Sequence, residues 1–531
     1  MRLAFLALCL IPASAHAQVG ALDTTFGDGG IVVDSISFYD DAYALVAQAD
    51  GDLLVVGSTS NLTPQGQSAQ TFLYDAAGAR IASWSADYFN VSCPQGVPEA
   101  FYNVIQEPDG MPVAVGFAQF DCGGPQRDFW IWRLDESGAR QSGFARPAFF
   151  GGTDYGWSVA RQPDGRLVVG GFVAPSNQDY ELGFTRYTTD GEIDLTFGTQ
   201  GETTIDIGSG TDVPYEIAIA PDGGIVVAGY AYDGSQYDMV LARLTPDGLP
   251  DPAFGADGVI VIDDGGDDFG LDLAMLPDGT FLVSGYAEDA GGVNRAFVAR
   301  FLPDGTPDGT FGTSGRVTLD FTGLPAILIA LAVQADSKIV AAGYTETGAG
   351  GTETLDLAIA RLLPDGTLDP SFGTGGMQVA SWGPGPDYVR DLAIAPDGDL
   401  VVVGSHRTTI SEVNYHNIGL ARFNGDTPPV SNEETPSHAL GVAVTPNPVR
   451  HTAQIRFELA EAGPVELVVT DLLGRRMASL VAGEIRPSGA HSVHVDASSW
   501  APGVYLIRLV AGNEPKVGAS QLATQRLTVV R

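Results

Sequence analysis

One ten-residue motif recurs seven times along the chain and limits the possible folds more than any other feature. The motif has the form xPDGxxxVxG, seen as QPDGRLVVGG at 162–171 and APDGGIVVAG at 220–229. Successive copies lie 55 to 61 residues apart. A fixed period of this length is typical of repeat architectures, in which each copy is one supersecondary unit that buries its apolar face against its neighbours. The aspartates of the seven copies are Asp50, Asp109, Asp164, Asp222, Asp278, Asp336 and Asp397.

Each copy reads as four short strands. Proline restricts φ and Asp-Gly supplies turn chemistry, so a PDG between two apolar runs predicts a hairpin. In the fourth copy we expect strands at 216–220, 225–229, 238–244 and 259–263. The third strand carries an arginine that recurs at 133, 186, 243, 300, 361 and 422, and an LDxxFGxxG motif (22–30, 368–376) precedes the fourth strand. The pattern predicts an all-β, seven-bladed β-propeller with four-stranded blades.

The two ends of the repeat array predict how the ring closes. The last copy stops after its third strand, at 421–423, whereas an extra apolar run at 31–34 precedes the first copy. We therefore expect 31–34 to act as an N-terminal strand clasp that completes the seventh blade and removes an open sheet edge. An open β-solenoid is the alternative.

The composition narrows the class of protein further. The chain has 531 residues with 68 Gly and 33 Pro, which excludes a coiled coil or a mainly helical protein. Its net charge is −38, with only two lysines, Lys338 and Lys516. Such an acidic chain lacks the basic surface that nucleic acids or anionic membranes require, so we expect no nucleic-acid partner.

The N-terminal residues predict export. Residues 1–17 combine Arg2, an apolar run at 3–11 and a small-x-small site at 15–17, which is the pattern of a cleaved secretory signal peptide. No other segment is long and apolar enough to predict a transmembrane span. The remaining cysteines, Cys93 and Cys122, form either a disulfide or two free thiols.

A change of composition near residue 424 predicts a second domain. We assign 18–423 to the propeller, the polar, proline-bearing stretch 424–436 to a linker, and 437–531 to a small C-terminal β-sandwich. The last region has nine Lys and Arg against seven Asp and Glu, in contrast to the acidic repeats. Alternating apolar patterns predict its strands at 453–459, 465–470, 492–495, 504–510 and 523–530.

Two regions resemble known families. The LDxxFGxxG and PDG motifs of 22–423 are similar to the delta-60 repeat of bacterial extracellular proteins, which implies a secreted scaffold without assigned catalytic residues. The tail, with PNP at 446–448, TDLLGR at 470–475 and GVYLIRL at 503–509, resembles the C-terminal sorting domain of type IX secretion substrates. That resemblance implies a Bacteroidetes-type envelope, recognition of 437–531 by the secretion machinery, and display on the outer cell surface.

One set of carboxylates is a candidate metal site. Ten residues before each motif aspartate, six of the seven copies carry an acid and the sixth copy carries Ala326. These residues precede the innermost strand of each blade, so they are placed to ring one mouth of the central channel. Clustered carboxylates there either pair with the repeated arginines or cap turns, which is the interpretation we favour, or bind Ca²⁺, and acid/base catalysis is a third alternative. The six acids are Asp40, Glu99, Asp154, Asp212, Asp268 and Asp387.

The sequence predicts binding more readily than catalysis. The six blades before residue 406 have no histidine after signal removal, which excludes His-based triads there. His406 and His416 are expected to be surface residues of a loop at 405–417. Aromatic residues of the variable loops, such as Tyr155, Trp157 and Tyr388, either stack on sugars or pack between blades. We expect a surface-displayed adhesion scaffold, with a carboxylate-dependent polysaccharide hydrolase or lyase, or a structural surface-layer component, as alternatives.

Overall fold

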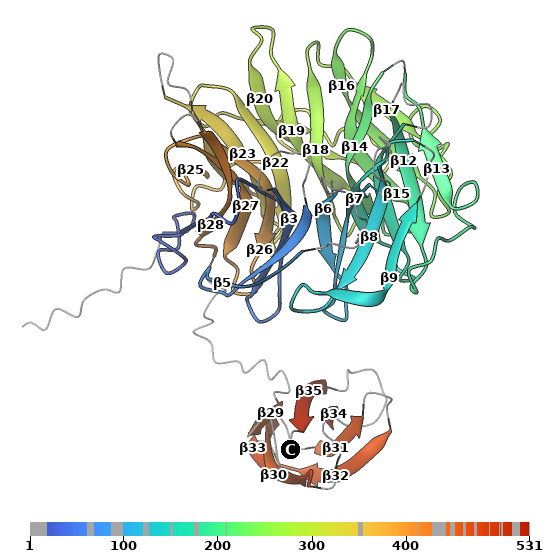
Figure 1. Cartoon of the computed structure of the whole chain (residues 1–531), viewed down its shortest axis with the longest axis vertical. Coiled ribbons are helices and arrows are strands. Elements are labelled where there is room, and N and C mark those ends of the chain that lie inside the picture. The colour runs from blue at the N-terminus through green and yellow to red at the C-terminus, as the bar shows by residue number, and fades with distance from the viewer. Residues whose placement is uncertain are drawn as a thin grey trace, which may run out of the picture. The chain divides into compact units, whose positions relative to one another are not determined.

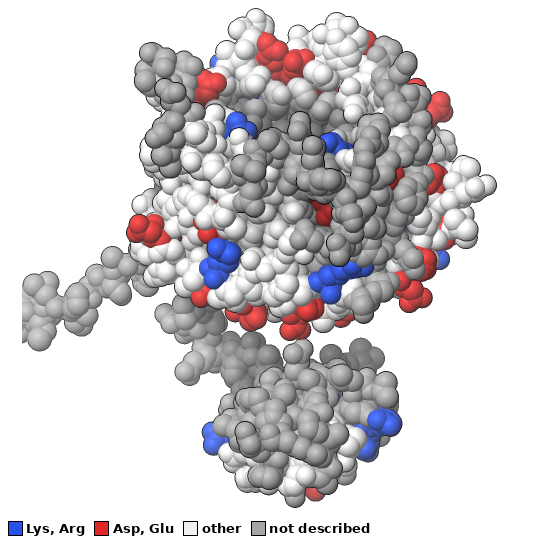
Figure 2. Space-filling view, in the orientation of Figure 1, with Lys and Arg blue, Asp and Glu red and all other residues white. Residues whose placement is uncertain are grey.

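A computed structural model confirms the all-β propeller (Figure 1). It describes residues 18–60, 68–85, 99–119, 127–148, 152–174, 180–208, 210–348, 354–410, 413–426, 442–445, 452–459, 463–471, 475–487, 489–498, 500, 503–511 and 521–529. No helix occurs in these residues, and hence none that is long and apolar enough to cross a membrane. The chain divides into two compact units, Met1–Pro428 and Pro429–Arg531. On the face of the first unit that Figure 2 shows, acidic side chains are more widespread than basic ones.

The strands of the first unit follow the four-strand period of the repeat. The first half of the array contains β1 (Ile31–Asp34), β2 (Tyr39–Ala47), β3 (Leu53–Ser60), β4 (Ser68–Tyr74), β5 (Arg80–Ser85), β6 (Glu99–Gln106), β7 (Pro112–Ala118), β8 (Asp128–Leu134), β9 (Arg140–Ala148), β10 (Tyr155–Arg161), β11 (Leu167–Val173), β12 (Glu181–Tyr187) and β13 (Glu202–Ile205). The second half contains β14 (Asp212–Ile219), β15 (Ile225–Tyr232), β16 (Tyr237–Leu244), β17 (Val259–Ile262), β18 (Asp268–Met275), β19 (Phe281–Glu288), β20 (Asn294–Phe301), β21 (Arg316–Leu319), β22 (Ala326–Val333), β23 (Ile339–Thr347), β24 (Thr354–Leu362), β25 (Met377–Ala380), β26 (Asp387–Ile394), β27 (Leu400–Ile410) and β28 (Val413–Phe423).

These strands form antiparallel sheets of consecutive strands. Five sheets have four strands each: β6–β9, β10–β13, β14–β17, β18–β21 and β22–β25. An eight-stranded sheet contains β2–β5 and β26–β28 with β1, joined by one parallel pair, Tyr39 with His416. The first strand of each group contacts the first strand of the next, and β26 contacts β2, so the inner strands close a ring. The ring excludes the open solenoid. The predicted number of seven blades stays a prediction, because strand pairing merges the first and last groups into one sheet.

The N-terminal clasp is confirmed. Strand β1 pairs antiparallel with β28, from Ile31 opposite Ala421 to Asp34 opposite Ile418. The backbone N–H of Gly20 donates to the carbonyl of Asn424 at 2.7 Å, and the N–H of Asn424 donates to Ala21 at 2.8 Å. The N-terminal segment therefore supplies the outer strand of the last group and satisfies the backbone groups of an edge that would otherwise be open.

The PDG turns form as the sequence predicts. In the fourth copy, Ala220 and Gly223 form a turn in which the N–H of Gly223 donates to the Ala220 carbonyl at 2.8 Å. The carboxylate of Asp222 accepts from the N–H of Gly224 at 3.0 Å. Gly223 has a φ of 87°, a conformation that L-residues adopt at a cost of about 1–2 kcal/mol. The sixth copy has Ser337 at this position, with a φ of 68°.

The repeated arginine joins each blade to the next. Arg186 of β12 donates from Nε to Asp194 at 2.9 Å and from Nη1 to the carbonyl of Pro246, in the turn that follows β16 of the next blade, at 2.6 Å. Nη1 also donates to Oε1 of Gln162, the first residue of the motif copy at 162–171, at 3.3 Å. Its guanidinium also stacks over Phe197, with 5.0 Å from Cζ to the ring centroid. Arg300 and Arg361 repeat the ion pair and the ring contact. The three sequence motifs therefore form one inter-blade contact on the face that carries the PDG turns.

A β-bulge interrupts the inner strand of every copy. The register of each inner pair skips one residue, for example between Pro214 and Glu216 in β14 and between Leu328 and Ala330 in β22. The residue that precedes the skip faces the last glycine of the xPDGxxxVxG motif, such as Gly343 opposite Leu328. A Cβ on Gly343 would overlap the carbonyl oxygen of Ile327, and the equivalent glycines of the other copies show the same overlap. The motif glycine therefore permits the bulge.

The second unit is a β-sandwich, as predicted. One sheet consists of β29 (Val442–Thr445), β30 (Thr452–Leu459) and β33 (Gly489–Asp496). The other is ordered β32 (Arg476–Arg486), β31 (Gly463–Asp471), β34 (Gly503–Ala511) and β35 (Gln521–Val529). A buried cluster that includes Phe457, Leu467, Trp500 and Ile507 forms its core. The sequence pattern missed β29 and β32.

Three details differ from the expectations or lie outside them. The expected loop at 405–417 forms most of the hairpin β27–β28 instead, because residues 400–410 pair in register with residues 413–423. Asp426, in the predicted linker, contacts Arg361 and Lys338 of the propeller at 3.0 and 2.5 Å. The signal peptide, Cys93, Cys122 and most of the linker lie outside the described residues, so these assignments stay predictions.

Candidate functional site in the central channel

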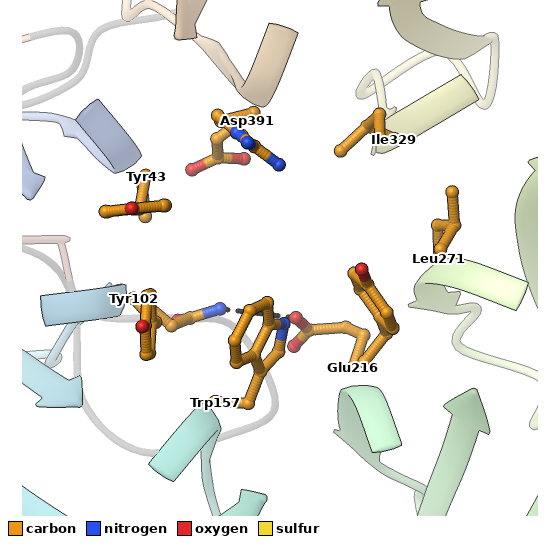
Figure 3. Close-up of a pocket in the computed structure, with 11 residues that line it drawn as sticks. Tyr43, Tyr102, Trp157, Glu216, Leu271, Ile329 and Asp391 are labelled. Atoms are coloured by element: carbon orange, nitrogen blue, oxygen red, sulfur yellow. Dashed lines mark hydrogen bonds between the residues drawn. The ribbon is translucent and has the colours of Figure 1, made fainter. Parts of the chain in front are cut away.

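The bulged residues of the inner strands line one cavity at the centre of the ring. The skipped positions include Tyr43, Tyr102, Trp157, Tyr215 and Arg390, together with Leu271 and Ile329. All of them border one cavity that is open to solvent. Figure 3 shows labelled side chains from successive inner strands pointing toward a common centre. A bulge turns the extra residue away from the sheet, which explains why this one repeat position forms the wall of the channel.

Four of these seven residues are aromatic and follow one another around the ring. The ring centroids of Tyr43 and Tyr102 lie 4.9 Å apart, those of Tyr102 and Trp157 4.4 Å, and those of Trp157 and Tyr215 5.4 Å. Each side chain is half-buried, so part of each ring stays accessible from the channel. One half of the channel wall is therefore a continuous aromatic surface.

The next residue of each inner strand brings polar groups to the same channel. Asn103, Glu216 and Asp391 border the cavity, and Ser158 and Asp272 occupy the same repeat position. The carboxylate of Glu216 accepts from Oγ of Ser158 at 2.6 Å and from Nδ2 of Asn103 at 3.2 Å, the latter bond drawn in Figure 3. These bonds connect the inner strands of three successive blades.

Two further carboxyl groups hold the backbone of the following blade. Asp391 accepts from the N–H of Leu45, in β2, at 2.8 Å, and from that of Leu392 at 2.7 Å. Asp272 accepts from the N–H of Leu331, in β22, and from that of Leu273 at 2.6 Å. A bulge leaves such N–H groups without a strand partner, so the carboxyl groups replace the missing ladder bonds.

Burial shifts the ionisation of these three carboxyl groups in the same direction. Burial raises the pKa of Asp391 to about 7, although the hydrogen bonds from its two N–H donors lower the pKa. Burial likewise raises the pKa of Asp272 to about 7. Burial, followed by the charge of Asp272, raises the pKa of Glu216 well above its ordinary value. At neutral pH the channel therefore holds protonated as well as ionised carboxyl groups, which can donate or accept hydrogen bonds.

Arg390 supplies the positive charge of the cavity. Its guanidinium lies 5.8 Å from the centroid of Tyr43. Within the described part of the chain it forms no ion pair, and its buried Nε has no hydrogen-bond partner. A half-buried guanidinium of this kind has donors available for a ligand.

The six predicted carboxylates are all buried, and Ca²⁺ binding by them as a ring stays a prediction. Asp40, Asp212, Asp268 and Asp387 are buried and accept from backbone N–H groups four or five residues earlier. Each acid thus caps the loop that enters its blade, which is one of the alternatives that the sequence left open. The repeated arginines form ion pairs with other acids, such as Asp194 and Asp369. Glu99 and Asp154 are also buried at the same repeat position. Among the described residues, only Asp268 of the six belongs to a group of three potential metal ligands.

The structure places the other candidate residues in packing contacts within a blade or between neighbouring blades. Tyr155 stacks on Phe172 with centroids 4.6 Å apart, and Tyr388 packs against Tyr344 at 5.5 Å, so aromatic residues of the variable face largely pack on one another. His406 is 2% exposed and lies 2.5 Å from Asp387. The expectation of a surface histidine is wrong here, because residue 406 lies in β27 opposite Asp387 of β26.

Sequence reasoning missed the channel residues as a set. Glu216, Asp272 and Asp391 lie six residues before their motif aspartates, and the other copies have Ala, Asn or Ser at that position. No single type of residue recurs there. The available signal was the invariant last glycine of the motif, which marks the bulge that points the preceding side chain inward.

Comparisons with protein families identify both units. Residues 162–197, 220–254, 276–311 and 334–372 match the domain of unknown function (DUF5122) beta-propeller, and residues 443–519 match the secretion system C-terminal sorting domain. The narrower delta-60 assignment stays a prediction. No curated protein matches the chain.

Solved structures similar to this chain are distant. A fungal alcohol oxidase in complex with copper has 15% identity and a TM-score of 0.43, over 95% of this chain and 100% of the other. The β-propeller domain of the trilobed protease from Pyrococcus furiosus has 12% identity and a TM-score of 0.39, over 74% and 95%. An α-L-arabinofuranosidase from Fusarium graminearum has 11% identity and a TM-score of 0.34, over 76% and 97%. None of these scores supports an argument about function. The family matches show that the chain contains DUF5122 β-propeller repeats within 162–372 and a secretion-system C-terminal sorting domain at 443–519.

Proposed function

We propose that this protein is an exported binding module that holds the end of a saccharide chain in the mouth of its central channel. The sorting domain supports export by the type IX system to the cell surface or beyond. Adhesion through the propeller, attachment at the surface and removal of residues 1–17 as a signal peptide are parts of the same proposal.

The observation that carries the proposal is the convergence of the bulged residues on one cavity. Tyr102, Trp157 and Tyr215 offer ring faces against which the apolar C–H face of a sugar can pack. Asn103 and Glu216 offer acceptors and donors for hydroxyl groups, and Arg390 offers further donors. Aromatic rings combined with a few converging polar groups are typical of small-molecule sites.

A carboxylate-dependent hydrolase or lyase is the second candidate, because one specific observation favours it. Glu216 and Asp391 border the same cavity, and the pKa of each is raised, as a general acid requires. Binding is favoured over catalysis because both oxygens of Asp391 already accept backbone N–H groups of the fold. A carboxyl group in that role stabilises the ring in the absence of any ligand.

The test uses the full chain on a panel of neutral and uronic-acid oligosaccharides, with retention and newly formed chain ends measured together. We expect saturable retention, no new ends, and at least tenfold weaker binding in Trp157→Ala and Arg390→Gln. Tyr415→Ala is the matched control, because Tyr415 stacks on Phe38 outside the channel.

Each other outcome contradicts the proposal in a different way. New reducing or unsaturated ends that disappear in Glu216→Gln would establish the enzyme instead. Equal retention by the channel variants and the control would place binding elsewhere on the surface. Absence of retention on every saccharide would favour the structural surface-layer role.

A further inference from the structure

Three aspartates meet where the fourth repeat passes into the fifth. Asp238 lies in β16, Asp263 follows β17, and Asp268 begins β18. One carboxylate oxygen of each lies within 4.8 Å of the others. Two oxygens that bind one Ca²⁺ at about 2.3–2.6 Å lie at most about 5 Å apart, so this spacing fits a shared ion. Among the described residues this is the only such group of three.

Asp268 has an oxygen that the protein does not use. The residue is 2% exposed, and its Oδ2 accepts from the N–H of Asp264 at 2.6 Å. Its Oδ1 is buried and has no hydrogen-bond partner. A buried carboxylate oxygen without a donor costs free energy unless a ligand supplies the missing interaction. The orphaned atom is thus a second sign, independent of the acid cluster, that something binds at this junction.

The negative charges around these aspartates also outnumber the nearby positive ones. Asp233, Asp264 and Asp267 act electrostatically on Asp238 or Asp268, and Arg316 is the cation that acts on Asp268. Arg316 already pairs with Asp264. Burial, followed by the charges of Asp264 and Asp238, raises the pKa of Asp268 to about 6. A divalent cation would offset this excess of negative charge far better than one shared arginine.

Gln236 spans two of the three carboxylates. Its Nε2 donates to Oδ1 of Asp238 and to Oδ1 of Asp263, each at 2.9 Å. Rotation of the amide by 180° exchanges its nitrogen and oxygen. In that orientation the Gln236 carbonyl would be a fourth oxygen ligand, which suits the coordination that Ca²⁺ prefers.

We propose that Asp238, Asp263 and Asp268 form a Ca²⁺ site that links the outer strand of one blade to the inner strand of the next. The ion ties β16 and the end of β17 to the start of β18. This site differs from the predicted ring, because it uses one blade junction and two acids outside the repeated position. It is independent of the saccharide proposal, since none of its ligands borders the channel cavity.

The test is calorimetric titration of the metal-free full chain with Ca²⁺. We expect one ion per chain with a Kd between about 10 µM and 1 mM, in the range of sensor and extracellular sites. Asp268→Asn should weaken binding at least tenfold. Asp263→Asn should do the same, and because Asp263 is exposed, this variant keeps the fold.

Asp212→Asn is the matched control. Asp212 occupies the same repeat position as Asp268 and accepts from Ile207 in the same way, but it belongs to no such group of three among the described residues. The affinity of Asp212→Asn for Ca²⁺ should stay within twofold of that of the parent protein. Ca²⁺ should raise the Tm of the parent protein and of Asp212→Asn by a few degrees, and it should leave the Tm of Asp263→Asn unchanged. Absence of saturable heat up to about 10 mM Ca²⁺, or unchanged affinity in Asp263→Asn, would overturn the proposal.

Discussion

Replacing Asp391 by asparagine tests whether ionisation of a buried channel carboxyl group destabilises the folded state. In the folded state burial raises the pKa of Asp391 to about 7, from an ordinary value of 3.8. The folded state therefore binds this proton more tightly than the unfolded state does. The stabilisation by the bound proton is largest at acidic pH and is lost as the pH rises through about 7.

The size of the effect follows from these two pKa values. For a group that titrates at about 7 when folded and 3.8 when unfolded, the free energy of unfolding falls by about 3 kcal/mol between pH 5 and pH 8. Asparagine does not titrate, so the variant lacks this contribution. It also keeps a single acceptor oxygen for the N–H groups of Leu45 and Leu392, which costs about 1–3 kcal/mol at both pH values. Asp391→Asn should therefore be less stable than the parent protein at pH 5 and about equal or more stable at pH 8.

Urea unfolding of the full chain at pH 5 and pH 8 provides the measurement. Tryptophan fluorescence reports mainly on the propeller, because five of the six tryptophans lie in it and only Trp500 lies in the sorting domain. Asp28→Asn is the control, since it makes the same chemical change at an exposed position. If the stability difference between Asp391→Asn and the parent protein changes by less than about 1 kcal/mol between the two pH values, the raised pKa is wrong.

Three further changes test other parts of the argument. Arg361→Lys removes a fully buried guanidinium from its contacts and should lower the free energy of unfolding in urea by about 3–5 kcal/mol. Arg80→Lys, at a side chain that is 34% exposed, should lower it by less than about 1 kcal/mol. Equal losses in the two variants would refute the inter-blade role. Gly343→Ala should lower the Tm by several degrees because its Cβ overlaps the bulge carbonyl, while Gly309→Ala, with open space around it, should leave the Tm unchanged. Deletion of 437–531 should leave a folded propeller that is retained in the periplasm, and surface display of the truncated chain would contradict the sorting role.

Much of the fold was predictable because its information is local. The signals for the PDG turn, the alternating strands and the LDxxFG motif each lie within a few residues. The same signals recur in register in the seven copies. The clasp was also predictable, since the array lacks one strand at its end and has one extra at its beginning. The strands β29 and β32 were missed because β29 has only four residues, whereas β32 contains Gly483 and pairs with shifts in register.

The candidate site depends on the tertiary structure. Glu216 and Asp391 are far apart in sequence and belong to no shared motif, yet ring closure and the bulge bring both to one cavity. The same holds for Asp238 and Asp268, which meet only because β16 and β18 belong to neighbouring blades. A repeated sequence determines the shape of one blade, because turns and alternation act over short distances. Which side chains face each other across the channel depends on how the blades pack. The sequence of a single repeat does not determine that packing, because it involves residues of other blades.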